Sequence, residues 1–172
     1  CISGVLVVEL DPSGNASIEA SEVVLSNTDN CQIEELSLSQ NAFSCSDVED
    51  LVLIQISSED DSGNISDCIV SIDVQDNTDP VFSCQNITVS LNDEGLATVA
   101  PGDIILGVFE PCGIDDISLD IGSFDCDDIG INNVIISISD NNGNTGFCFA
   151  DVTIVDEIAP IVECQNTTVS LN

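Results

Sequence analysis

The sequence predicts an all-β fold, and three observations carry this prediction. Apolar and polar residues alternate strictly over long segments, the chain repeats itself after about 80 residues, and it contains nine cysteines. Alternation with period two is typical of strands that bury one face, and it is clear in Cys68–Gln75, Val134–Ser139 and Cys148–Ile154. About seven short strands per repeat predict tandem immunoglobulin-like β-sandwich domains, stapled by disulfides.

The internal repeat sets the predicted domain boundaries. Cys31 and Cys112 are 81 positions apart, as are Cys45 and Cys126. The segment 84–92 recurs with one substitution as 164–172. We therefore expect a first repeat at 1–78, a second at 79–158, and the first strand of a third at 159–172. The chain reads as a piece of a longer tandem array.

Turn signals separate the predicted strands. Runs of Asp, Asn, Ser and Gly mark the turns at 11–15, 60–64, 93–95 and 140–144, because these residues favour tight backbone turns. Two weaker stretches, Ala20–Ser26 and Pro101–Val108, allow a helical turn. Short proline-containing segments, 76–80 and 156–160, read as joints between the predicted repeats, where proline limits the backbone conformations.

The charge balance excludes several functions. The chain has 32 Asp and Glu and no Lys, Arg or His, which gives a formal charge of −32. Such a chain cannot neutralise phosphates, so nucleic acid is excluded as a partner. We also expect no direct insertion into a membrane, because no segment approaches the roughly 20 continuous apolar residues of a membrane span. The usual general bases and amine nucleophiles are missing. We therefore expect no enzymatic activity. Apolar residues make up 43% of the chain, enough to build cores.

The cysteines predict disulfides and an oxidising compartment. From residue order and strand position we expect the pairs Cys31–Cys45, Cys112–Cys126, Cys1–Cys68 and Cys84–Cys148, with the partner of Cys164 outside this chain. Four cysteines per repeat allow three connectivities, so other pairings stay open. Zinc ligation is the alternative, although the C-x2-C spacing typical of structural zinc sites is absent.

The acidic turns and joints predict calcium sites, since calcium prefers carboxylate and amide oxygens. Two groups are expected, one in each repeat: Asp60, Asp61 and Asn64 with Asp76 and Asp79, and Asp140, Asn142 and Asn144 with Asp156 and Glu157. The alternative is that these residues are solvated turn residues, because Asp and Asn favour turns for backbone reasons alone. Calcium is the one cofactor that the sequence suggests.

The repeats resemble the hyalin-repeat (HYR)-like, immunoglobulin-like domains of long secreted Bacteroidota adhesins, such as the flavobacterial gliding-motility adhesin. The resemblance rests on segments 79–89, 110–114, 124–126 and 140–148. It implies secretion, attachment at the cell surface and a filamentous stalk without catalytic residues.

The function expected from these features is a structural stalk or filament segment built from rigid repeats. Its expected partners are neighbouring repeats of the same chain, with lateral self-association through cations. The alternative is a ligand-binding adhesion module whose acidic loops hold a carbohydrate or protein through a bridging cation.

Overall fold

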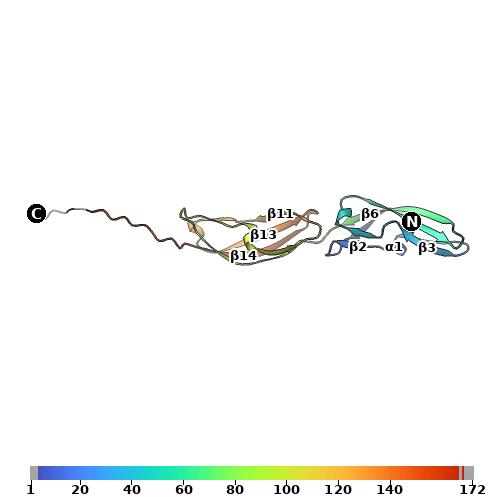
Figure 1. Cartoon of the computed structure of the whole chain (residues 1–172), viewed down its shortest axis with the longest axis horizontal. Coiled ribbons are helices and arrows are strands. Elements are labelled where there is room, and N and C mark those ends of the chain that lie inside the picture. The colour runs from blue at the N-terminus through green and yellow to red at the C-terminus, as the bar shows by residue number, and fades with distance from the viewer. Residues whose placement is uncertain (1–3, 167, 169–172) are drawn as a thin grey trace. The chain divides into compact units, whose positions relative to one another are not determined.

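The computed structural model describes residues 4–166 and 168. It confirms the all-β class: the described part of the chain contains fourteen strands and four short helical segments (Figure 1). The first half contains β1 (Val5–Glu9), β2 (Asn15–Ser17), α1 (Ala20–Val23), β3 (Ile33–Leu38), β4 (Ala42–Ser44), η1 (Cys45–Asp47), β5 (Val52–Asp60) and β6 (Ile65–Gln75). The second half contains β7 (Val81–Cys84), β8 (Ile87–Ser90), β9 (Ala97–Thr98), α2 (Pro101–Ile104), β10 (Ile105–Phe109), β11 (Ile114–Leu119), β12 (Ser123–Phe124), η2 (Cys126–Asp128), β13 (Gly130–Asp140) and β14 (Thr145–Val155).

The chain divides into two compact units that are discontinuous in sequence. Unit 1 contains the residues up to Phe82 together with Gly107–Ile117 and Ser137–Gly146. Unit 2 contains Ser83–Leu106, Ser118–Ile136 and the residues from Phe147 onward. The predicted repeats at 1–78, 79–158 and 159–172 follow the sequence period and stay a prediction.

A four-stranded sheet in the order β1-β6-β5-β3 forms the larger layer of unit 1. The first strand pairs parallel to β6, with Val8 opposite Val74, and β5 and β6 form an antiparallel hairpin. The alternation predicted for β6 is confirmed, because Val70, Ile72 and Val74 are at most 1% exposed while their neighbours are not buried.

The second layer of unit 1 closes the core from the other side. It consists of the pair β2–β4 and helix α1. Phe43 of β4, Val23 of α1 and Ile18, which lies between β2 and α1, join the same apolar cluster as β1, β5 and β6. Two β layers around one core are the arrangement expected of a sandwich. The helical turn suggested within Ala20–Ser26 is present as α1, where the Glu22 carboxylate accepts a hydrogen bond from the Glu19 N–H (2.7 Å).

A second four-stranded sheet, in the order β11-β13-β14-β8, follows the same plan. Strand β14 pairs parallel to β8, with Val152 opposite Ile87. The predicted inward face is buried: Val134, Ile136, Ile138, Ala150, Val152 and Ile154 are each at most 2% exposed. The helical turn suggested within Pro101–Val108 is present as α2.

Candidate functional site

The disulfides are the first feature that the structure places. Cys84 on β7 is bonded to Cys148 on β14, with 6.0 Å between their Cα atoms. This is the pair expected from the sequence. Cys68 on β6 is also disulfide-bonded, and its expected partner, Cys1, lies outside the described residues.

A second disulfide overturns two expected pairs. Cys45 is bonded to Cys112 with a Cα–Cα distance of 5.1 Å, and both residues belong to unit 1. Neither Cys31–Cys45 nor Cys112–Cys126 is formed, and Cys31, Cys126 and Cys164 are free and exposed.

The two expected disulfides do not form because the strands between their cysteines run from one end of the fold to the other. Gln32, the residue after Cys31, accepts a hydrogen bond at its carbonyl from the Asp61 N–H, at the hairpin between β5 and β6. The Cys45 Sγ instead lies 3.8 Å from the Gly14 carbonyl, in the turn that follows β1 at the opposite end of β6. Strands β3 and β4 carry the chain from one end of the unit to the other, so a short separation in sequence becomes a long one in space.

The same geometry divides both predicted calcium groups. Asp60 and Asp76 lie at opposite ends of β6, whose 11 residues span roughly 36 Å. Asp140 and Asp156 are likewise separated by the 11 residues of β14. In each predicted calcium group, the turn residues and the joint residues are therefore too far apart to bind one ion together.

The turn carboxylates of these groups are already occupied by hydrogen bonds. Asp60 accepts bonds from the N–H groups of Ser62 (2.9 Å) and Asn64 (2.8 Å) and from the Asn64 side chain (2.8 Å). The pKa of Asp60 is lowered, chiefly by the Asn64 side chain and then by its backbone N–H. Asp140 makes the same three bonds, two from backbone N–H groups and one from the Asn144 amide. For these two residues the turn interpretation accounts for the geometry.

The remaining residues of the two predicted calcium groups lie in exposed turns, in the segment after β14, or near the turn at 140–145. Asp61 and Asn142 are exposed in the two hairpin turns. The exposed Asp156 and Glu157 accept bonds from the Ile158 N–H and the Ser90 hydroxyl, respectively. Asp79 accepts a bond from the Thr145 N–H (3.2 Å), and the Asn144 amide donates to the Asp76 carbonyl (3.0 Å). The structure thus brings Asp76 and Asp79 to the turn at 140–145, a regrouping across the two predicted sets.

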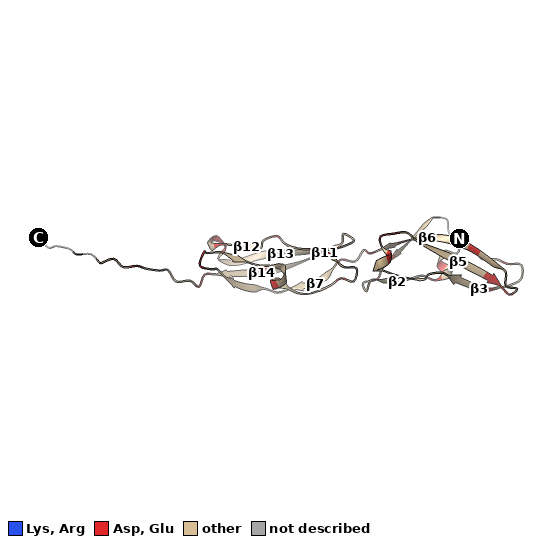
Figure 2. Cartoon of the chain, turned by 45° about the horizontal axis from the view of Figure 1, so that its top comes forward, with Lys and Arg blue, Asp and Glu red and all other residues tan. Residues whose placement is uncertain are grey.

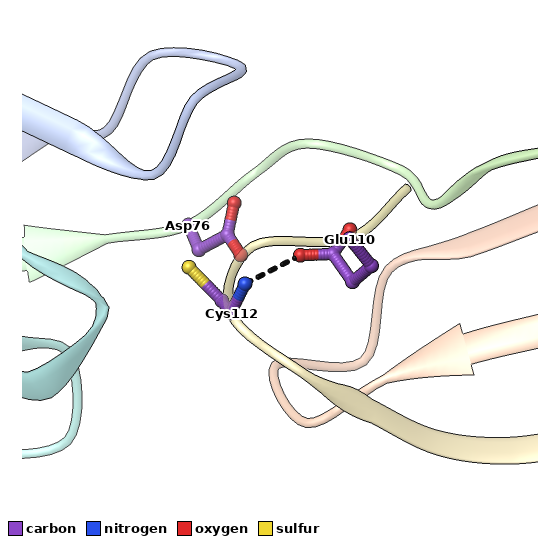
Figure 3. A group of neighbouring side chains, drawn as sticks. All are labelled: Asp76, Glu110 and Cys112. Carbon is purple, nitrogen blue, oxygen red and sulfur yellow. Dashed lines mark hydrogen bonds between the residues drawn. The ribbon is translucent and has the colours of Figure 1, made fainter. Parts of the chain in front are cut away.

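Unit 1 contains a small acidic cluster, which we define as Asp76, Glu110 and Asp140. Asp76 is 6% exposed and Asp140 is 2% exposed. Figure 3 shows the Asp76 side chain on one segment, with Glu110 and Cys112 on another. One carboxylate oxygen of Asp76, one of Glu110 and the Cys112 Sγ all lie within 4.8 Å of one another. Two ionised carboxylates at such a separation repel by about 3–4 kcal/mol at an effective dielectric near 20.

Two oxygens of this cluster have no hydrogen-bond partner in the described part of the chain. They are Asp76 Oδ2 and Glu110 Oε2, and both are buried. The other oxygen of each group is occupied: Asp76 Oδ1 accepts from the Thr78 N–H (3.1 Å), and Glu110 Oε1 accepts from the Cys112 N–H (2.9 Å). Buried polar atoms without partners are rare, because their lost hydration is not replaced.

Electrostatics at Glu110 follow from this environment. Its pKa is raised, first because burial removes water from the carboxylate and also because Asp76 and Asp140 add negative charge; the Cys112 N–H opposes the shift. A carboxyl whose pKa is higher in the folded chain destabilises the fold once it is ionised. This contribution therefore becomes unfavourable as the pH rises through the raised pKa.

Sequence reasoning identified Asp76 and missed Glu110. In the sequence, Glu110 is marked only by its position two residues before Cys112. That position does not indicate a site near Asp76 until the Cys45–Cys112 bond is known. The chain carries no Lys or Arg that could neutralise the cluster, as Figure 2 also shows. Neutralising the cluster therefore takes a proton or a cation from outside the chain.

Several solved structures align with this chain, with low TM-scores and low sequence identity. No protein-family model and no curated protein matches the chain. Among solved structures, a three-Ig fragment of titin aligns with a TM-score of 0.42 and 10% identity, over 88% of this chain and 62% of the fragment. A human mucin-like protocadherin fragment aligns with a TM-score of 0.36 and 12% identity, over 88% of this chain and 95% of that one. Fibronectin(III)-like modules of Clostridium thermocellum CbhA give a TM-score of 0.35 and 9% identity, over 95% and 97%.

A search of the described residues for membrane-spanning helices finds no helix that is both long and apolar enough to cross a bilayer.

Proposed function

We propose that this chain is a structural spacer in an extracellular adhesive or fibrous protein, secreted and displayed at the cell surface. The observation that carries the proposal is the Cys45–Cys112 disulfide inside unit 1. It covalently joins a residue of the first predicted repeat to a residue of the second. In this proposal the bond cross-links successive repeats, so that they resist extension and loosening, as a spacer requires.

The chemistry of the chain supports a structural role over catalysis. Its cores consist mainly of aliphatic residues, many of them alternating along strands. Its polar residues lack the imidazole and amine groups on which most acid–base and nucleophilic catalysis depends. Disulfides of this density are typical of proteins outside the reducing cytosol.

The 81-residue offset of the repeat suggests that equivalent disulfides join further pairs of repeats. Cys126 corresponds to Cys45 and Cys31 corresponds to Cys112, each 81 positions away. The sulfur of Cys126 lies 3.8 Å from the Gly95 carbonyl, just as that of Cys45 lies 3.8 Å from Gly14. In this proposal Cys126 bonds to a following repeat and Cys31 to a preceding one.

The backbone around Cys31 supports the correspondence with Cys112. The Cys31 N–H donates to the Asp29 carboxylate (2.7 Å), and the Cys112 N–H donates to the Glu110 carboxylate (2.9 Å). In both places the acid stands two residues before the cysteine. Cys31 and Cys126 thus each share a local contact with their counterparts in the Cys45–Cys112 bond.

Oxidation of the purified chain at high concentration tests this pattern. In a Cys164→Ser background, which removes the third exposed thiol, Cys126 of one copy should bond to Cys31 of the next and give a ladder of covalent oligomers on a non-reducing gel. A further Cys31→Ser or Cys126→Ser change should stop the ladder at the dimer. An oligomer ladder that persists in either variant, or no ladder with both thiols present, would contradict the proposed linkage.

A further inference from the structure

The acidic cluster of unit 1 is built around two carboxylate oxygens that the folded chain leaves without a partner. Asp76 Oδ2 and Glu110 Oε2 are both inaccessible to solvent and accept no hydrogen bond among the described residues. The whole Asp76 side chain is 6% exposed. An ionised carboxylate is rarely buried unless a positive charge or a donor compensates it.

The surrounding hydrogen bonds hold both groups in place. The Asn144 amide donates both to the Asp140 carboxylate (2.8 Å) and to the Asp76 carbonyl (3.0 Å), which ties the turn at 140–144 to Asp76. On the other side, the Cys112 N–H fixes Glu110 Oε1, and the disulfide to Cys45 fixes Cys112. The two unpartnered oxygens are therefore positioned by groups that are themselves held.

The donor atoms select the kind of ligand. The Cys112 sulfur lies within 4.8 Å of one carboxylate oxygen of Asp76 and one of Glu110, but it is bonded to Cys45 and offers no thiolate. The oxygens that remain suit a hard divalent cation, which binds carboxylates and completes its coordination with backbone carbonyls and water. A thiophilic metal such as zinc has no thiolate ligand here.

We propose that a hard divalent cation, with calcium as the first candidate, binds between the carboxylates of Asp76 and Glu110. The ion supplies the positive charge that the chain lacks and converts a repulsion between two neighbouring carboxylates into a bridge. It links the segment that follows β6 to the segment that precedes β11. This inference does not depend on the proposed spacer function, since it concerns one site within unit 1.

Calcium binding to the intact chain tests the site directly. Isothermal titration calorimetry in about 0.15 M salt, where the diffuse attraction of exposed acids is screened, should show one saturable site with a Kd on the order of 0.1–1 mM, as in extracellular calcium modules. Glu110→Gln should weaken this site at least tenfold. Glu94→Gln, the same change at an exposed glutamate, should leave it unchanged.

Thermal unfolding provides a second measurement, because the effect of Glu110→Gln on the melting temperature should reverse its sign when calcium is added. In excess chelator, Glu110→Gln should raise the melting temperature of unit 1, because it removes one of two repelling carboxylates. In millimolar calcium the same variant should melt below the unsubstituted chain, because it loses the bridge. Asp76→Asn should weaken calcium binding in the same way.

Three results would overturn the proposal. One is no saturable binding of calcium or magnesium. Another is equal binding by the unsubstituted chain and both site variants. The third is Glu110→Gln raising stability equally with and without calcium, which would show that no ion bridges the two carboxylates.

Discussion

Replacing both Cys84 and Cys148 by Ser is expected to lower the free energy of unfolding by about 4 kcal/mol. The bond between them closes a loop of 64 residues, and opening a loop of that length returns about this much conformational freedom to the unfolded chain. It also ties the end of β7 to β14 through two cysteines that both belong to unit 2. Since a small domain has a net stability of only about 5–15 kcal/mol, the loss should be evident.

Urea denaturation of the oxidised chain, followed by circular dichroism, measures this effect. Cys164→Ser is the control, because that thiol is free and exposed and its replacement should shift the midpoint very little. A double variant that unfolds within 1 kcal/mol of the unsubstituted chain would mean that the Cys84–Cys148 bond does not constrain the fold.

Ile72→Ala is expected to cost roughly 2–5 kcal/mol. Ile72 is 0% exposed and lies opposite both Leu6 of β1 and Val52 of β5. Removing its side chain leaves a cavity among strands that cannot collapse without breaking their pairing. The effect should appear in unit 1, whose apolar cluster contains this residue.

A position on the same strand provides the matched control for this cavity. Ile69 lies on β6, and its side chain is 66% exposed, so Ile69→Ala should change the stability by less than about 0.5 kcal/mol. Equal losses for the two variants, measured by denaturant unfolding, would contradict the assigned inward face of β6.

The strands were predictable because their signal is local. Alternation in Cys68–Gln75 and Cys148–Ile154 follows directly from side chains pointing to opposite faces of a strand, and the buried residues of β6 and β14 are those the pattern indicates. The turns were predictable for a similar reason, since Asp60 and Asp140 bond to backbone N–H groups two and four residues ahead.

The cysteine pairing and the site were less predictable because both depend on which ends of strands meet. Cys31 and Cys45 are close in sequence, yet two strands carry them to opposite ends of unit 1. Asp76 was expected to meet Asp60, but it lies nearer Glu110 and the turn at Asp140. No local pattern reports such proximity, and a single sequence gives no covariation from which to infer it.

The disulfide map of the unreduced protein tests the central claim most directly. The chain has no trypsin site, so digestion with pepsin suits it, and the acid conditions also suppress thiol–disulfide exchange. Mass spectrometry should find one linked peptide pair containing Cys45 and Cys112 and another containing Cys84 and Cys148. Peptides that link Cys31 to Cys45 and Cys112 to Cys126 would contradict the cross-link on which the spacer function and the geometry of the cation site depend.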